Sequence, residues 1–212
     1  MKHRIAGASN HLGHARHELE RHTAQLLAGT VTIYPVGHAI VDMTTIAAAP
    51  SEIGRRALSR IVTCIGGRAY APRVERLERL YYRVTHGKLG RGATLGGCLL
   101  SPVRDGVLVV REPQAIREKL NVGVPSEVIW DGRFRLSLRS ADSQCRMALI
   151  IAALGRDGWS KLAERQPEYR KLSIPGRVRH GLPALWSNGR LVGVPHLGYW
   201  ARTRSTTSKI RC

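Results

Sequence analysis

The chain has 212 residues, of which 34 are Lys or Arg and 15 are Asp or Glu, so its formal net charge at pH 7 is +19. Hydrophobic residues make up 43% of the sequence, which suffices for a packed core and excludes a chain that is disordered throughout. No apolar run approaches the roughly 20 residues of a membrane-spanning helix, and residues 1–14 lack the apolar core of a secretory signal. We therefore expect one or two modest domains in the cytoplasm.

The positive charge is concentrated in two segments. Residues 55–91 hold ten Lys or Arg against two Glu, and residues 169–212 hold nine Lys or Arg and no acidic residue. Such an imbalance adds nothing to fold stability, because like charges repel in a compact state. The usual compensation is a polyanion, most often nucleic acid, whose binding weakens steeply with salt. The alternative is a basic face that is only solvated.

Apolar periodicity predicts three helices in the first part of the chain. The first covers residues 11–27, the second is capped by Ser51 and continues to Ile65, and the third begins at Pro72, since proline is favoured at the first helical position. One arc of the third helix is apolar: Val74, Leu77, Leu80, Tyr81 and Val84. The adjacent arc is a ridge of arginines: Arg73, Arg76, Arg79 and Arg83.

Two further features of this helix follow from the spacing. Glu75 can pair with Arg79, and Glu78 with Arg79 or Tyr82, so part of this positive charge is expected to be neutralised. Gly87, Gly90 and Gly92 predict a flexible exit and a hinge, which Lys88 and Arg91 make basic.

After Arg91 the pattern becomes that of strands. Hairpins are expected over residues 94–111, with Asp105-Gly106 at the turn, over 128–138 with Asp131-Gly132, and over 184–194 with Asn188-Gly189. Gly96-Gly97 is expected to mark a bulge within a strand or a place of close packing. His196 is expected at an exposed position at the end of the last hairpin. The predicted fold class is α+β, with a helical basic part followed by a small α+β domain built on β-hairpins.

The sequence offers no catalytic chemistry of its own. The four cysteines form no Cys-x-x-Cys pair, and His11, His14 and His17 drift around a helix without holding one face. Nucleotide-binding glycine motifs and paired carboxylates are absent from the printed sequence. We therefore expect no catalytic, cofactor-binding or metal-binding residue, and a chain that binds rather than catalyses.

Several short stretches carry a resemblance to a known family. They are Arg56-Ala-Leu-Ser-Arg60, Gly66-Gly-Arg-Ala-Tyr70, Arg76-Leu-Glu-Arg-Leu80, Thr94-Leu-Gly-Gly-Cys98, Val109-Val-Arg-Glu-Pro113, Trp130-Asp-Gly-Arg-Phe134, Leu182-Pro-Ala-Leu-Trp186 and Gly189-Arg-Leu-Val-Gly-Val-Pro-His-Leu-Gly198. In this order and spacing they resemble the C-terminal half of bacterial tRNA(Ile)-lysidine synthetase, of the proteobacterial type. The resemblance covers roughly residues 12–200.

That family uses ATP to join lysine to the wobble cytidine of an isoleucine tRNA, in an N-terminal PP-loop domain that a Ser-Gly-Gly-x-Asp-Ser motif opens. The motif is absent from the printed sequence, so no catalytic residue carries over, and ATP and Mg²⁺ are implied only for the complete family enzyme. The resemblance implies a tRNA-binding portion that is inactive alone. The expected partners are tRNA, in particular tRNA(Ile) with a CAU anticodon, and a separate PP-loop catalytic polypeptide. A stand-alone RNA-binding module without catalytic activity and a decayed gene remnant stay open as alternatives.

With the resemblance, the expected domains are a mainly helical, basic tRNA-binding region (1–90), a small α+β C-terminal domain (91–200) and a disordered basic tail (201–212). The expected RNA-binding residues form two sets: Arg73, Arg76, Arg79, Arg83, Lys88 and Arg91, and then Arg177, Arg179 and Arg190. Tyr81 and Tyr82 are candidates for stacking on an exposed base. The place of Tyr81 on the apolar arc favours the core instead.

Overall fold

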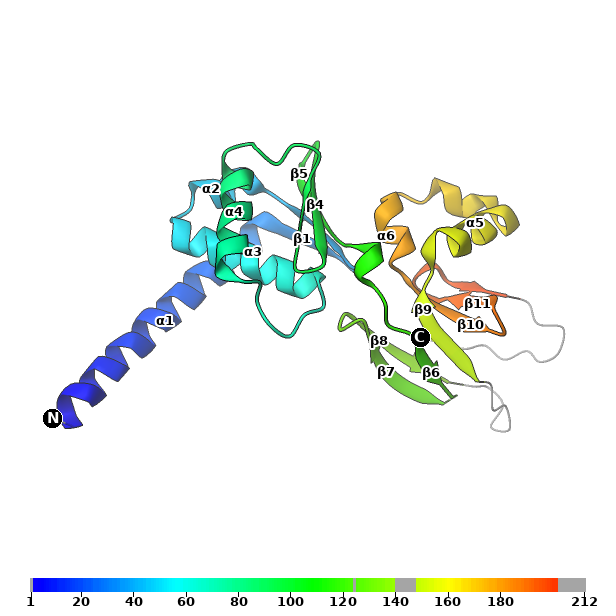
Figure 1. Ribbon diagram of the computed structural model, residues 1–212, viewed down its shortest axis with the longest axis horizontal. Coiled ribbons are helices and arrows are strands. Elements are labelled where there is room, and N and C mark those ends of the chain that lie inside the picture. The colour runs from blue at the N-terminus through cyan, green and yellow to red at the C-terminus, as the bar shows by residue number, and fades with distance from the viewer. Residues whose placement is uncertain (1, 124, 140–147, 202–212) are drawn as a thin grey trace. The chain divides into compact units, whose positions relative to one another are not determined.

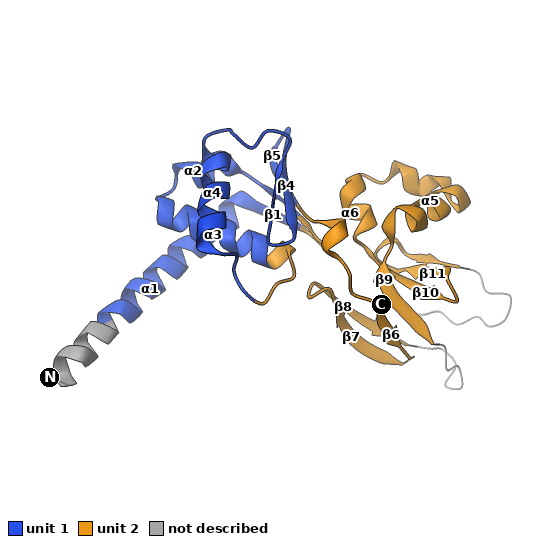
Figure 2. Cartoon of the chain, viewed as in Figure 1, with its two compact units in different colours: residues 1–33, 39–63, 70–109 blue, residues 34–38, 64–69, 110–212 orange. Residues whose placement is uncertain are grey.

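The computed structural model describes residues 2–123, 125–139 and 148–201, with side chains from residue 11 onward. The chain divides into two compact units (Figure 2). Unit 1 consists of residues 1–33, 39–63 and 70–109, and unit 2 of residues 34–38, 64–69 and 110–212. Residues 91–109, which the sequence assigns to the second domain, belong to unit 1 in this division. Of the expected tail, residues 202–212 lie outside the described residues.

The described residues of unit 1 form four helices: α1 (Lys2–Thr30), α2 (Met43–Ala48), α3 (Ser51–Ile65) and α4 (Val74–Thr85). Helix α1 projects away from the rest of the unit (Figure 1), and its side chains at residues 11–18 are exposed. Helix α3 follows the prediction, with Ala57, Leu58 and Val62 fully buried. Asp42 caps α2, and its hydrogen bonds with Thr45 hold the pKa of its carboxyl below the ordinary value. No helix in the described stretches is long and apolar enough to span a membrane.

Helix α4 differs from the prediction at its start. It begins at Val74, because Arg73 has an extended backbone (φ −58°, ψ 137°), and Pro72 lies outside the helix beside Gly96. Leu77, Leu80 and Val84 are buried as expected, whereas Val74 in the first turn is 63% exposed. The buried part of the apolar arc therefore begins only at Leu77. Contacts with α2 and β3 (Ala93–Leu95) hold α4 in place.

A five-stranded sheet completes this part of the chain. Besides β3 it contains β1 (Val31–Tyr34), β2 (His38–Val41), β4 (Cys98–Val103) and β5 (Gly106–Arg111), in the order β1-β2-β5-β4-β3. Leu95 pairs with Cys98, and both residues between them, Gly96 and Gly97, have positive φ. This pair is thus the tight turn of a β3–β4 hairpin and not a bulge, since two positive φ values suit a two-residue turn. The expected close packing is confirmed at Gly96, where an added Cβ would lie 2.7 Å from the Val62 side chain.

Unit 2 is built on antiparallel strands. Its five-stranded sheet has the order β12-β11-β10-β9-β6, and a separate hairpin joins β7 to β8. The strands are β6 (Leu120–Val122), β7 (Ser126–Trp130), β8 (Phe134–Leu138), β9 (Leu149–Ala153), β10 (Pro183–Ser187), β11 (Arg190–Val194) and β12 (Tyr199–Trp200). The helices are α5 (Gly155–Arg165) and α6 (Gly176–His180), with 3₁₀ turns η1 (Pro113–Ala115), η2 (Pro167–Lys171) and η3 (Pro195–Leu197).

Two predicted hairpins of unit 2 are confirmed. Asp131 and Gly132 lie in the β7–β8 turn, and Asn188 and Gly189 in the β10–β11 turn, all four with positive φ. Unit 2 has two cores. One lies around Trp130, Leu136 and Ile151 of the strands, and the other includes Leu162 of α5 and the strand-flanking Leu154 and Leu182. The α+β fold class is confirmed.

Candidate nucleic-acid interface

The outward side of α4 carries the arginine ridge that the sequence predicts. Because a helix turns every 3.6 residues, burial of Leu77, Leu80 and Val84 points the other side of α4 toward solvent. The first predicted set is exposed throughout: Arg73, Arg76, Arg79, Arg83, Lys88 and Arg91. We call this set the α4 cations.

The carboxylates on and beside α4 do not pair with the α4 cations. Glu78 pairs with Arg55 of α3 (3.6 Å), and Arg79 Nε donates to the backbone oxygen of Glu75 (3.2 Å), so the expected pairing of Glu75 and Glu78 with Arg79 is wrong. Glu52 accepts hydrogen bonds from Arg55 and Arg56. These bonds lower the pKa of the Glu52 carboxyl, and the bond from Arg55 has the larger effect. In the described part of the chain, no α4 cation forms an ion pair with a carboxylate.

Arg83 differs from the other α4 cations because its guanidinium group holds a loop. It donates to the backbone oxygens of Lys88 (3.3 Å), Leu89 (3.1 Å) and Gly92 (3.3 Å). Leu89 is 5% exposed. The exit after α4 is therefore a fixed loop within unit 1 and not a hinge between the units. Arg83 positions Lys88 rather than offering its own charge freely.

The second predicted set lies in unit 2 and is heterogeneous. Arg177 is exposed in α6, and Arg190 is exposed at the start of β11, next to the Asn188-Gly189 turn. Arg179, in contrast, donates to the backbone oxygens of Ile174 (2.6 Å) and Leu172 (2.9 Å), and its guanidinium lies 4.5 Å from the centre of the Trp159 ring. These contacts give Arg179 a structural role.

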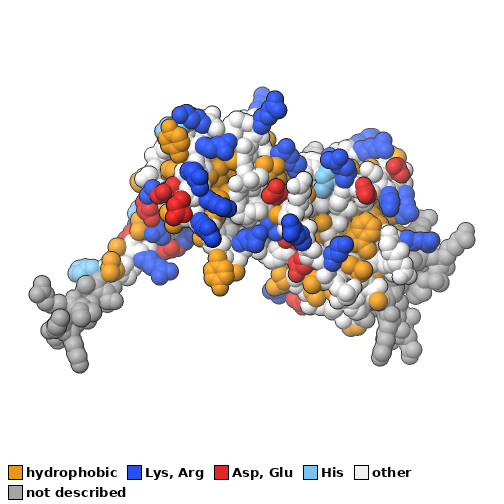
Figure 3. Space-filling view, viewed as in Figure 1, with side chains coloured by type: hydrophobic (Ala, Val, Ile, Leu, Met, Phe, Trp, Pro, Cys, Tyr) orange, Lys and Arg blue, Asp and Glu red, His pale blue; other side chains and the backbone are white. Residues whose placement is uncertain are grey.

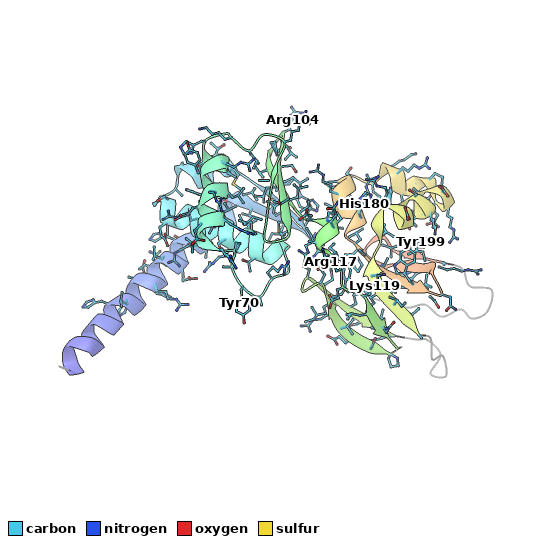
Figure 4. The ribbon with its side chains drawn as sticks, viewed as in Figure 1. Tyr70, Arg104, Arg117, Lys119, His180 and Tyr199 are labelled. Carbon is cyan, nitrogen blue, oxygen red and sulfur yellow. The ribbon has the colours of Figure 1, made fainter. Side chains whose placement is uncertain are left out.

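Several exposed residues were not predicted from the sequence as site residues. Figure 4 labels Arg104 at the β4–β5 turn, Tyr70 in the loop before α4, and Arg117 and Lys119 between η1 and β6. Tyr70 is 87% exposed, and the three cations are exposed as well. The charged stretch Arg-Glu-Lys at residues 117–119 could have indicated that Arg117 and Lys119 are exposed.

Unit 2 also contains a buried ion cluster. Both guanidinium groups of Arg111 and Arg133 bind the carboxylate of Asp131, at 2.8 Å each, and all three side chains are at most 7% exposed. Arg133 also donates to the backbone oxygens of Gly37 (3.5 Å) and Gly181 (3.3 Å). Two stretches of the family resemblance, 109–113 and 130–134, thus meet in one set of contacts, which removes two arginines from the surface.

Figure 3 shows Lys and Arg side chains spread over the visible face of the molecule, with Asp and Glu side chains gathered mainly beside α1 and α3 in unit 1. Glu20, which pairs with Arg56 and Arg60, belongs to this region. Fold and surface together define a strongly basic α+β protein whose exposed cations suit a polyanionic ligand.

Comparison with known proteins identifies the relatives of the chain, although no family model matches it. It is 30% identical over 196 residues to tRNA(Ile)-lysidine synthase of Ruegeria pomeroyi, which covers 92% of this chain and 43% of that protein. It is 23% identical over 211 residues to the enzyme of the same name from Wolbachia pipientis wMel, covering 99% and 47%. A Wolbachia of Brugia malayi has a third relative of that name, at 24% identity over 199 residues.

The chain is thus similar over nearly its whole length to part of the tRNA(Ile)-lysidine synthases, which confirms the resemblance seen in the sequence motifs. It spans less than half the length of the curated relatives it matches.

Proposed function

We propose that this chain is the tRNA-binding portion of a tRNA(Ile)-lysidine synthase, with tRNA(Ile) bearing a CAU anticodon as its substrate. The observation that carries the proposal is the row of α4 cations without carboxylate partners in the described residues. Arginine and lysine side chains in such a row bind successive phosphates of an RNA backbone. The names of the relatives supply the class of RNA.

The chemical step belongs to a part of the enzyme that the printed sequence does not contain. Its ATP-binding motif, Ser-Gly-Gly-x-Asp-Ser, is absent from residues 1–212. The proposal therefore assigns ATP, Mg²⁺ and the joining of lysine to a PP-loop segment or a separate PP-loop polypeptide. This chain binds the tRNA substrate, and alone it has no ligase activity.

The experiment is a measurement of affinity for unmodified tRNA(Ile) with the CAU anticodon and for elongator tRNA(Met), across a salt series. These two RNAs separate a specific substrate-binding portion from a general one. We expect tighter binding of tRNA(Ile) and a steep loss of affinity as salt rises. Equal affinity for both RNAs would favour the alternative, a stand-alone RNA-binding module, and absence of binding would overturn the proposal.

A further inference from the structure

An aromatic pair lies on the outward side of α4, where the helix ends. The rings of Tyr82 and His86 stack with their centres 4.0 Å apart and their planes 29° from parallel. Tyr82 is 49% exposed, and His86 is exposed as well. The neighbouring Tyr81 behaves differently, since it packs against Gly54 and burial raises the pKa of its hydroxyl. Tyr81 therefore belongs to the core, while Tyr82 presents an aromatic surface to solvent.

The stacked pair has a fixed geometry. The Nδ1 atom of His86 lies 2.9 Å from the backbone oxygen of Tyr82, and because a carbonyl oxygen only accepts, Nδ1 donates. The other ring nitrogen, Nε2, has no partner among the described residues. Lys88 Nζ donates to the Tyr82 hydroxyl (3.2 Å) and is 5.1 Å from the ring centre, so the ammonium group lies toward the hydroxyl end of the ring.

The backbone around the pair is also fixed. The amide nitrogen of Lys88 donates to the oxygen of Arg83 (2.7 Å), and that of His86 to the oxygen of Tyr82 (3.1 Å). The Arg83 guanidinium binds three backbone oxygens of the same loop. A ligand that uses Tyr82, His86 and Lys88 therefore meets groups already in place, which lowers the entropy cost of binding.

A second Tyr–His stack provides a comparison. Tyr34 and His38 are parallel, with ring centres 4.4 Å apart, but His38 is 4% exposed and burial lowers the pKa of its imidazole. That pair contributes to packing. Only the pair on α4 combines exposure of both rings with a bound ammonium group, among the described residues.

We propose that the Tyr82–His86 pair is a stacking platform for an unpaired base of the bound RNA, with Lys88 and Arg79 on the adjoining phosphates. This inference rests on the proposed function and adds the form of RNA that the site takes. Aromatic rings stack on any base, and cations beside them neutralise the backbone. A base inside a duplex already stacks on its neighbours, so the platform favours a single-stranded stretch, such as a loop or an end.

The test compares a short uridine oligonucleotide with an RNA duplex of the same length, each titrated with the full chain. Tyr82→Ala removes the ring, and Tyr82→Phe keeps the ring but loses the hydroxyl that Lys88 binds. Tyr70→Ala is the matched control, because Tyr70 is an exposed tyrosine of the same unit for which the described residues supply no ring partner. Thermal unfolding of each variant verifies that it is folded.

We expect Y82A to weaken binding of the uridine oligonucleotide about 5- to 100-fold, the range for loss of one stacked base. Its duplex affinity and the salt dependence of binding should stay unchanged, and Y82F and Y70A should retain the single-strand affinity. Equal loss for both RNAs, no loss for either, or the same loss in Y70A would overturn the platform while leaving salt-dependent binding by the α4 cations intact. A chain that binds neither RNA would overturn the platform together with the proposed function.

Discussion

Arginine has two opposite uses in the two units. On α4 of unit 1, Arg76 and Arg79 point to solvent and form no ion pair with a carboxylate in the described residues. In unit 2, Arg111 and Arg133 share the carboxylate of Asp131 and are almost completely buried. The first arrangement leaves charge available for a ligand, whereas the second uses charge to join distant segments of the chain.

The difference shows that net charge alone does not measure a binding surface. The chain has a formal charge of +19, but the charges of Arg111 and Arg133 are enclosed, and Arg55, Arg56 and Arg60 of α3 are paired with Glu52, Glu78 and Glu20. What matters for a polyanion is the subset of cations that are both exposed and without a carboxylate.

The largest effect is expected in the buried cluster of unit 2. Asp131→Asn should lower the free energy of unfolding by about 3–5 kcal/mol, because two buried guanidinium groups lose their counter-charge. Asparagine tolerates the positive φ of residue 131 (52°), so the backbone is not the cause. Denaturant unfolding measures the loss. Asp105→Asn in the exposed β4–β5 turn is the control, and an equally small change in both variants would contradict the role of the cluster.

A smaller effect should separate two arginines of the same helix. Arg83→Met should cost about 1–2 kcal/mol, since it removes the guanidinium that binds three backbone oxygens of the loop. Arg76→Met removes the same charge but no such contact, and should change stability by less than about 0.5 kcal/mol. The comparison uses urea midpoints of the two variants. Similar losses would mean that Arg83 does not hold the loop.

The smallest effect concerns the pH dependence of unit 2. The ring of His196 lies edge-on to Phe134 with centres 4.8 Å apart, and burial, followed by the charge of Arg133, lowers its pKa. The unfolded chain then binds a proton more readily than the folded one, so this contribution is complete above about pH 6.5 and is lost as pH falls toward the folded value. The melting temperature should therefore fall as the pH is lowered from about 7.5 to about 5.5. His196→Gln should reduce that decline, and an unchanged decline would exclude His196 as a source.

Local features of the fold could be predicted from the sequence. Asp131-Gly132 and Asn188-Gly189 identify their hairpins because these tight turns require positive φ at both residues, which Asp, Asn and Gly tolerate. The same holds for α3, whose apolar spacing is regular. Gly96-Gly97 also supplies the positive φ of a tight turn. The apolar residues on both sides of this pair nevertheless led to the prediction of one continuous strand.

Long-range contacts could not be predicted in this way. Arg111 and Asp131 are 20 residues apart, and nothing in either neighbourhood distinguishes them from solvated charges. Arg83 lies on the same predicted arc of α4 as Arg76. Its structural role comes only from the loop after the helix, whose backbone oxygens it binds. His196 was expected at the surface, but Phe134, distant in sequence, covers it. The sequence thus predicted that the arginines of α4 form an exposed surface. It did not predict which arginines make structural contacts.

RNA binding should depend on the unpaired cations of α4 and not on the total charge of the chain. The direct test is the slope of log affinity for tRNA(Ile) against log salt in two double variants of equal charge. Arg76→Gln with Arg79→Gln should reduce the slope by about 1 to 2, one phosphate contact for each cation. Arg21→Gln with Arg135→Gln removes cations already paired with Glu18 and Glu127 and should leave the slope nearly unchanged. The same reduction in both double variants would contradict the account.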